Sequence, residues 1–352
     1  MTLWIIACGA MIVIPRLGLK TFYQQGILDR PWKDVPARPS VPNFQGVVLI
    51  VAVWVVLGVM WLIHDEVWTM LIATSLLSIV VLVDDILHRY RRISLPSRLR
   101  LVLQISIVSV TVVVGGLGNH IMIAGQSLSP LIGTLLAIGW IVSFINCINR
   151  SDGVYGMASG VSSIGYMSIW LLLLWVVIPH YTDISIEKLS QITHLWYTAL
   201  RLAGIACIYT IIEWKPRWVV RDVGTTWYGF TLGYLTLVAG AKIGLIIIVL
   251  SLPIFDSIWV VINRIIMKKS PLHGDFTHLH HRLLRLGWSR TEIRVVIWCY
   301  TLVMTVLVLI QGVDGMNKLI LFGMMAMIFF GSHIYLYRYK KLPFEYIVAV
   351  KE

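Results

Sequence analysis

Residues 68–85 read WTMLIATSLLSIVVLVDD, an apolar run that ends in two adjacent carboxylates, Asp84 and Asp85. A run of this length and low charge is nearly long enough to cross a bilayer as an α-helix. The whole chain shares this character, because 58% of its 352 residues are hydrophobic and 13% are charged, against about 25% charged in soluble domains. These values predict an all-α, polytopic membrane protein.

Similar apolar runs recur along the whole length, and no separate soluble domain fits between them. We therefore expect a single integral membrane domain over residues 1–352, with a cytoplasmic histidine-rich loop at 264–292. The sequence predicts about eleven transmembrane helices, near residues 3–14, 47–63, 68–83, 101–116, 131–148, 160–178, 195–212, 227–240, 243–263, 293–312 and 319–337.

The basic residues predict the orientation of these helices. Lys and Arg follow the first apolar run and do not precede it, which favours an external N-terminus and, after eleven spans, a cytoplasmic C-terminus. Roughly 25 of the 29 Lys and Arg residues then fall on the inner side; Lys188, Lys242 and Lys318 fall outside, and Arg201 lies within a span. The net charge of +12 therefore reflects mainly the membrane topology, and it also favours binding to anionic lipid head groups. Nucleic acid is not an expected partner.

Unusual polar residues gather at the expected inner ends of the spans. Asp84 and Asp85 repel each other unless a cation lies between them or one holds a proton, so a divalent metal shared with substrate phosphates is one solution. An ordinary acidic helix end is the other. Asp222 precedes Gly-Thr-Thr at a helix start, where it either caps the helix or binds metal. Asp256 is a carboxylate within an apolar run, without an evident partner.

Two further stretches carry polar side chains. Residues 146–160 read NCINRSDGVYGMASG, in which Asn146 and Asn149 share one helical face and the glycines let a ligand approach the backbone, although a cap and turn have the same pattern. Residues 270–282 read SPLHGDFTHLHHR and concentrate four of the ten histidines. Imidazoles at this density suit phosphate or metal, including zinc, and a solvated loop is the alternative.

Together these residues resemble the polyprenyl-phosphate N-acetylhexosamine-1-phosphate transferases, bacterial relatives of phospho-N-acetylmuramoyl-pentapeptide transferase. No single motif suffices, but their order is specific and covers almost the whole chain. The resemblance rests on Asp29-Arg30-Pro31, Pro42, Gly46, Asp84-Asp85, Arg100, Gln104, Asn146, Asn149, Asp152, Gly153, Asp222, Gly224, Asp256, Ser270-Pro271, Asp275 and His278-Leu279-His280-His281.

The resemblance implies a reaction in which polyprenyl phosphate attacks the β-phosphorus of a UDP-sugar, giving a polyprenyl-diphospho-sugar and UMP. It implies Mg²⁺, with Mn²⁺ as a substitute, and a site facing the cytoplasm in the bacterial inner membrane. A homodimer is a further expectation. The implied catalytic and metal-binding residues are Asp84, Asp85 and Asp222, and the implied substrate-binding residues are Asn146, Asn149, Asp152, Tyr155, Glu213, Asp275, His278, His280 and His281.

The sequence departs from the family pattern at several motif positions, namely Ala37, His88, Tyr155, Glu213 and Phe276. Tyr155 and Glu213 occupy positions that lie near the nucleobase in the family, so either donor recognition differs or activity is lost. A catalytically degenerate homologue that binds lipid phosphate or nucleotide sugar as a scaffold is therefore the alternative. A transporter is a third class, which the lack of paired half-sequences disfavours.

Overall fold

The computed structural model describes most of the chain. The described residues are 45–59, 65–91, 93–123, 126–177, 186–214, 219–239, 243–271, 277–311 and 315–338, with a few positions between 13 and 24. The expected first span at 3–14, the resemblance residues Asp29 to Pro42, the site residue Asp275 and the C-terminal tail lie outside the described residues.

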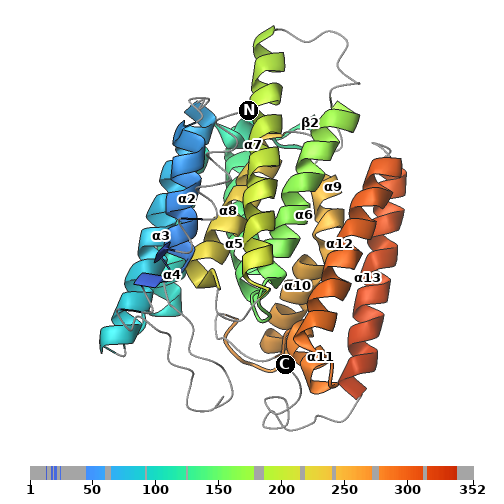
Figure 1. Ribbon diagram of the computed structural model, residues 1–352. Helices are drawn as coiled ribbons and strands as arrows, with labels where there is room; N and C mark the ends of the chain where they lie inside the picture. Colours follow the sequence, from blue (N-terminus) through green and yellow to red (C-terminus); the bar gives the residue numbers. More distant parts are fainter. Residues whose placement is uncertain are drawn as a thin grey trace.

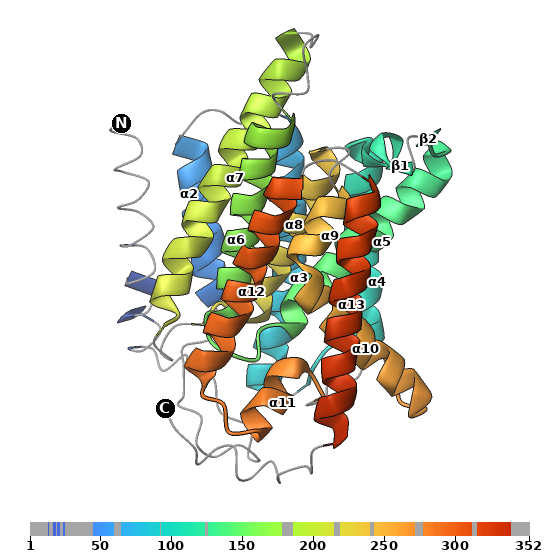
Figure 2. The ribbon, with the colours of Figure 1, turned by 90° about the vertical axis from the view of Figure 1, so that its right-hand side faces the viewer.

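The described chain is a bundle of long helices (Figures 1 and 2). A 3₁₀ turn η1 (Leu117–His120) precedes a two-residue antiparallel pair, β1 (Met122–Ile123) and β2 (Gln126–Ser127), and a π-helical turn η2 (Leu173–Val177) follows α6. The α-helices are α2 (Gln45–Val59), α3 (Asp65–Arg91), α4 (Ser97–Val114), α5 (Pro130–Arg150), α6 (Met157–Leu172), α7 (Ile186–Ile212), α8 (Arg221–Val238), α9 (Ile243–Val249), α10 (Ser251–Ile266), α11 (Leu279–Arg285), α12 (Arg290–Gln311) and α13 (Gly315–Arg338).

Within the described residues, six helices are long and apolar enough to cross a membrane, and they match six of the expected spans. They cover residues 68–88, 97–114, 130–150, 157–175, 189–212 and 290–310. Two shorter apolar stretches, 46–55 and 320–333, lie within α2 and α13. The protein is therefore an all-α, multi-pass membrane protein, whereas the full number of spans and the orientation of the termini stay predictions.

Helix α8 lies inside the bundle, where it packs against α2, α3, α5 and α6. Its side chains are buried from Val223 to Leu237, including three Thr hydroxyls that bond back to the helix backbone at Arg221, Trp227 and Gly233. Small residues let the neighbouring backbones approach. A Cβ on Gly229 would lie 2.5 Å from the Cα of Ile145 in α5.

The expected ninth span at 243–263 is not one helix, and this expectation is wrong. Helix α9 ends at Val249 and α10 begins at Ser251, because Leu250 leaves helical geometry with φ −98° and ψ 19°. Pro253 has no N–H to donate to the carbonyl of Val249, and proline is tolerated only in the first turn of a helix. The chain therefore restarts here, and the far end of α10 points away from the other helices (Figure 2).

Gly229→Ala tests the close contact between α5 and α8. The added Cβ would meet backbone atoms that cannot move aside alone, so we expect a loss of about 1–3 kcal/mol in the free energy of unfolding. The control is Gly139→Ala in α5, where a Cβ meets nothing within 4 Å. Thermal unfolding in detergent compares the two, and equal stability of both variants would contradict the packing described.

Candidate functional site

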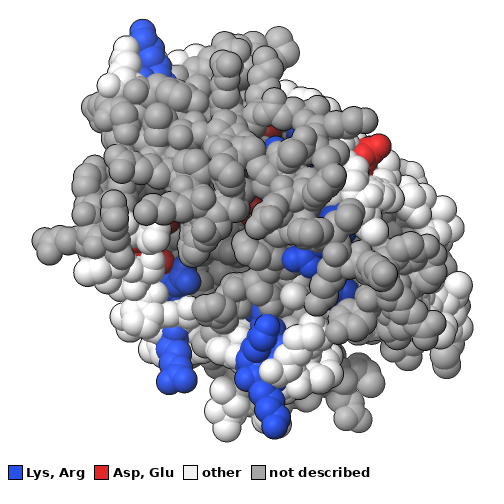
Figure 3. Space-filling model, turned by 90° about the horizontal axis from the view of Figure 1, so that it is seen from below, with Lys and Arg blue, Asp and Glu red and all other residues white. Residues whose placement is uncertain are grey.

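Polar elements meet at one end of the bundle, the lower end in Figure 1. The carboxyl ends of α3 and α5, the amino ends of α8 and α12, and α11 all lie there. Seen from this end, Lys and Arg side chains stand out on the surface, and only small areas of Asp or Glu show (Figure 3). The exposed basic residues include Arg98, Lys268 and Lys269. This end therefore presents positive charge around acids that are mostly recessed.

Asp84 is buried at the end of α3, and both of its carboxylate oxygens have protein partners. Oδ1 accepts the backbone N–H of Leu95 at 2.6 Å, and Oδ2 forms an ion pair with Arg100 of α4 at 3.0 Å. His88, one turn further, contacts the Ser94 hydroxyl through Nδ1 at 2.8 Å. Asp84 thus fixes the connection between α3 and α4.

Asp85 has a different environment, although it is the next residue. Its Oδ2 is buried without a hydrogen-bond partner among the described residues, and the charges of Asp222 and Asp84 act on it together with that of Arg100. Asp222 lies in the first turn of α8 and is partly exposed. Two carboxylates at close range repel each other unless a cation joins them.

The donor set fits a cation that is completed by a ligand. Within the described ranges, no group of three or more His, Cys, Asp or Glu side chains is arranged to hold a metal ion alone. Mg²⁺ typically binds one or two carboxylates and takes its other ligands from water and substrate phosphates. Asp85 and Asp222 match that requirement, whereas the oxygens of Asp84 are already engaged.

The first turn of α8 is held from two sides. Glu213, which follows the end of α7, is buried and accepts the backbone N–H of Val220 at 2.6 Å through Oε1 and the Ser159 hydroxyl at 2.5 Å through Oε2. On the other side, a Cβ on Gly46 would lie 2.5 Å from the backbone nitrogen of Gly224. The backbone that carries Asp222 is therefore pinned. Glu213 has a structural role here, and its expected contact with a nucleobase stays a prediction.

Arg221, one residue before Asp222, adopts an unusual backbone conformation. Its φ is 55°, in the left-handed region that costs an L-residue roughly 1–2 kcal/mol. Burial lowers the pKa of the Arg221 guanidinium from its ordinary value, and the charge of Asp222 opposes that shift. The sequence does not indicate the conformation of Arg221, because neither its residue type nor its neighbours predict a positive φ.

The turn between α5 and α6 carries the amides and the carboxylate that the sequence singled out. Asn146 donates to the carbonyl of Val142 at 2.8 Å and lies 3.5 Å from the Gln104 amide oxygen. Asn149 and Asp152 are partly exposed. Tyr155 lies beneath Arg290 of α12, whose guanidinium carbon is 5.6 Å from the ring centroid. A cation therefore stands beside the substituted motif position.

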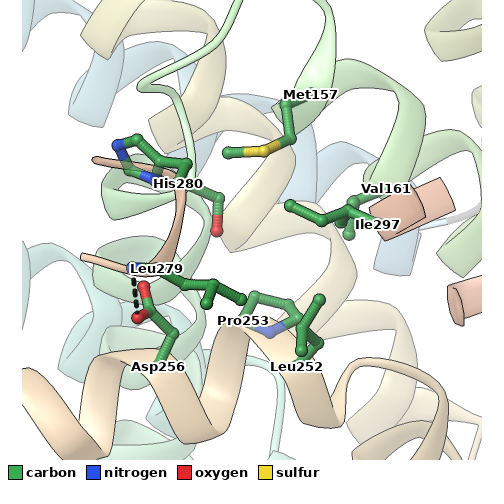
Figure 4. A pocket seen from close by; sticks show the side chains of 9 residues that line it. Met157, Val161, Leu252, Pro253, Asp256, Leu279, His280 and Ile297 are labelled. Carbon is green, nitrogen blue, oxygen red and sulfur yellow. Dashed lines mark hydrogen bonds between the residues drawn. The ribbon is translucent and has the colours of Figure 1, made fainter. Parts of the chain in front are cut away.

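The histidine segment is anchored to α10 by Asp256, the carboxylate whose partner the sequence did not reveal. His278 Nδ1 contacts Asp256 at 2.8 Å, and His333 Nε2 of α13 lies 3.8 Å from its Oδ1. The backbone N–H of Leu279 also donates to Asp256, at 2.8 Å (Figure 4). One buried carboxylate thus ties α10, α11 and α13 together. The expected loop at 264–292 contains the end of α10, all of α11 and the start of α12.

His280 packs against the turn between α5 and α6. A Cβ on Gly153 would lie 1.7 Å from its Nε2, so a residue other than glycine at this position would collide with the imidazole. Burial lowers the pKa of His280 well below its ordinary value, so the ring is neutral near pH 7. Its ring lies 4.1 Å from that of His281. A small pocket beside it is lined by Ser151, Met157, Val161, Leu252, Pro253, Asp256, Leu279, His280 and Ile297 (Figure 4).

The described contacts arrange the expected site residues in two clusters. The acid cluster contains Asp84, Asp85 and Asp222, and the imidazole cluster contains His278, His280 and Asp256. The end of α5 lies between them, because α5 packs against both α8 and α10. Whether one substrate spans both clusters stays a prediction.

The fold and these clusters define a class: a multi-pass membrane protein with a polar site at one end of its helices. Comparison with known sequences identifies it further. Residues 67–240 match the model of glycosyl transferase family 4. The chain belongs to this family and is therefore a membrane-embedded transferase of phosphosugars.

Individual relatives have related activities. Phospho-N-acetylmuramoyl-pentapeptide-transferase of Lactobacillus acidophilus is 25% identical over 81% of this chain and 88% of its own length. A probable undecaprenyl-phosphate N-acetylglucosaminyl 1-phosphate transferase of Bacillus subtilis is 30% identical over 46% of this chain and 44% of its own length. Decaprenyl-phosphate N-acetylglucosaminephosphotransferase of Mycolicibacterium smegmatis is 26% identical over 64% and 59%.

The buried Glu213 predicts a pH-dependent stability. Burial raises its pKa from 4.5 to about 7, and the hydrogen bonds from Ser159 and Val220 oppose this only in part. The native state therefore binds the proton more tightly than the unfolded state. The resulting stability is full below pH 4.5 and is lost as the pH rises through about 7.

Glu213→Gln mimics the protonated acid, since the amide oxygen still accepts from Val220 and the NH₂ group donates to Ser159. We expect the Tm of the wild type to fall relative to that of Glu213→Gln between pH 5 and pH 8. Thermal unfolding in detergent at a series of pH values measures the difference. Parallel Tm curves for the two proteins would show that Glu213 does not titrate in this range.

Proposed function

We propose that this protein transfers an N-acetylhexosamine-1-phosphate from a UDP-sugar to polyprenyl phosphate, with undecaprenyl phosphate as the natural carrier. An oxygen of the lipid phosphate attacks the β-phosphorus of the donor, the bond to UMP breaks, and polyprenyl-diphospho-sugar forms. The proposed place is the cytoplasmic face of a bacterial inner membrane, at the first membrane step of a cell-surface glycan such as O-antigen lipopolysaccharide. The observation that carries the proposal is the electrostatic interaction between the carboxylates of Asp85 and Asp222 at one end of the bundle.

The acid cluster suits the proposed chemistry, because both reactants are anionic and must approach each other. Asp85 and Asp222 would hold Mg²⁺, which when bound neutralises phosphate charge and orients the oxygens. Asp84 positions Asp85, because its ion pair with Arg100 and its hydrogen bond from the Leu95 backbone fix the last turns of α3. No strong base is needed, because the attacking lipid phosphate is already ionised.

We assign the nucleotide side to the turn between α5 and α6. Asn149 and Asp152 are polar and partly exposed there, and Tyr155 presents its ring below Arg290. We assign the sugar or diphosphate side to His278, His280 and His281, with Asp256 orienting His278. In support, His280 is neutral at pH 7 and packs on Gly153, within the same turn.

The second candidate function is that of a scaffold, a catalytically degenerate homologue that binds lipid phosphate or nucleotide sugar without transferring the sugar phosphate. Its support is Glu213, which is buried and takes part in hydrogen bonds within the fold instead of facing open space. Mass spectrometry of the lipid products formed by purified protein from polyprenyl phosphate and a mixed pool of UDP-sugars separates the two. Magnesium-dependent lipid product and UMP support the transferase, and binding without any product supports the scaffold.

Replacing each carboxylate of the acid cluster tests the catalytic assignment. Asp84→Asn, Asp85→Asn and Asp222→Asn should each lower turnover at least about a hundredfold, the scale expected when the electrostatics of phosphoryl transfer are disturbed. Asp84→Asn should also lower the Tm, because it weakens the ion pair with Arg100. UMP release in detergent with lipid substrate measures turnover.

Glu292→Gln is the matched control, because the amide oxygen retains the hydrogen bond from Ser289 at the start of α12. Its turnover should equal that of the wild type. Near-normal activity in all three Asp variants would remove the acid cluster from the mechanism.

Tyr155→Leu tests the nucleotide side. Loss of the ring beneath Arg290 should raise the KM for the UDP-sugar about threefold to tenfold with little change in kcat, since the residue lies away from the transferred phosphorus. The control is Tyr197→Leu in α7, whose ring also lies 5.6 Å from an Arg guanidinium, that of Arg201. A loss of Tm without any change in KM would place Tyr155 in the fold and not at the donor.

A further inference from the structure

His333 joins the imidazole cluster from α13, and its side chain is fully buried. Its ring lies 4.0 Å from that of Phe329 and 5.4 Å from that of Trp259. Arg282 also contacts the Trp259 ring, with its guanidinium carbon 5.9 Å from the centroid. One nitrogen of His333, Nε2, lies 3.8 Å from Oδ1 of Asp256. Burying a polar ring is costly unless its nitrogens are satisfied, so their partners indicate where His333 carries its protons.

The contacts of His333 favour a proton on each of its two nitrogens. Nδ1 lies 3.2 Å from the carbonyl oxygen of Phe329, and a carbonyl oxygen only accepts, so Nδ1 carries a hydrogen. Among the described residues Nε2 has no hydrogen-bond partner, and the group that it approaches is the Asp256 carboxylate. A bare Nε2 would turn a lone pair toward that negative charge, whereas a protonated Nε2 attracts it. His333 is therefore suited to balance Asp256 as a cation.

Asp256 carries this interaction to His278. Its Oδ2 lies 2.8 Å from Nδ1 of His278, and its Oδ1 accepts the backbone N–H of Leu279 at 2.8 Å. An ionised carboxylate only accepts, so Nδ1 of His278 carries a hydrogen and Nε2 is the nitrogen left for a reactant. Without a proton Nε2 accepts a hydrogen bond, and with one it donates. The charge of His278 thus decides which chemical group it can bind.

Two imidazoles compete to balance one carboxylate. Among the described residues, the ion-pair partners of Asp256 are His278 and His333. A charged His333 satisfies the carboxylate and disfavours a second positive charge on His278. The ring of His280 is stacked on that of His278 at 5.7 Å, and burial lowers the pKa of His280 so that it adds no charge near pH 7. His278 therefore stays neutral as long as His333 holds the proton.

We propose that His333 is a positioning residue: it balances the charge of Asp256, so that His278 keeps a single proton, on Nδ1, and offers Nε2 as a hydrogen-bond acceptor. The group that this nitrogen binds rests on the proposed function. It has to supply a hydrogen, as a hydroxyl or the acetamido N–H of the sugar does. A fully ionised phosphate only accepts and does not suit it. His278 is thereby assigned to the sugar and not to the diphosphate.

Nitrogen NMR of the full-length protein in detergent, with ¹⁵N-labelled histidine, tests the positioning without any turnover. The signals of His278 are those that disappear in His278→Gln. Near pH 7 the wild type should show one protonated and one bare nitrogen for His278. His333→Phe should show two protonated nitrogens there, because the charge of Asp256 is then unbalanced. His333→Lys supplies a cation again and should restore the bare nitrogen. If His333→Phe does not fold, His333→Gln removes the charge and keeps a polar side chain.

Ser332→Ala is the matched control, since the Ser332 hydroxyl donates to the same Phe329 carbonyl as His333, at 2.7 Å. It should leave the nitrogens of His278 as they are in the wild type. Two protonated nitrogens on His278 in the wild type would overturn the proposal. An unchanged His278 in His333→Phe would also overturn it, and a lower Tm with that result would reduce His333 to a tie between α10 and α13.

Steady-state kinetics test the contact with the sugar. His333→Phe should raise the KM for the UDP-sugar about threefold to tenfold near pH 7, and this KM should return toward that of the wild type at higher pH, where His278 loses its second proton. An unchanged KM, or a rise that does not depend on pH, would overturn the assignment to the sugar. If no UDP-sugar supports turnover but the nitrogens of His278 depend on His333, the proposed function fails while the positioning by His333 stands.

Discussion

The repulsion between Asp85 and Asp222 is the constraint on which the rest of this end of the protein depends. Folding brings these carboxylates together at a cost that only a cation or a proton removes. The fold tolerates this because each acid is held rigidly. Asp84 and Arg100 fix the end of α3, while Glu213 and Gly46 clamp the start of α8. The stability of the bundle is thus used to keep an unfavourable charge arrangement in place.

The imidazole cluster is organised by the opposite principle, because its central acid is satisfied. Asp256 accepts from the Leu279 backbone and contacts His278, and His333 approaches it from α13. A satisfied buried acid positions its neighbours instead of attracting a ligand. The end of α5 lies between the two clusters, and Gly153 in the turn that follows it packs against His280.

Much of this could be predicted from the sequence. The apolar runs predicted the six long helices. The family resemblance named Asp84, Asp85 and Asp222 as one set, and the roles of these residues stay predictions. What the sequence could not reveal depends on contacts between distant residues. The partner of Asp256 comes from α11 and α13, the internal role of Glu213 depends on Ser159 and Val220, and the backbone of Arg221 is set by its surroundings. The break at Leu250 is explained by Pro253, which lacks an N–H for an uninterrupted helix, whereas hydropathy alone predicts one continuous span.

That break has a consequence for assembly in the lipid. Peptide groups freed where α9 meets α10 cannot find water inside a bilayer, so protein must surround them. Helices α12 and α13 pack against α9, and the Tyr300 hydroxyl of α12 lies 2.9 Å from that of Ser251. A chain that lacked residues 290–338 would leave one side of this junction without its protein contacts. Helices α12 and α13 therefore complete the protein environment that α6 and α8 begin around α9, although they contribute few polar side chains to either cluster.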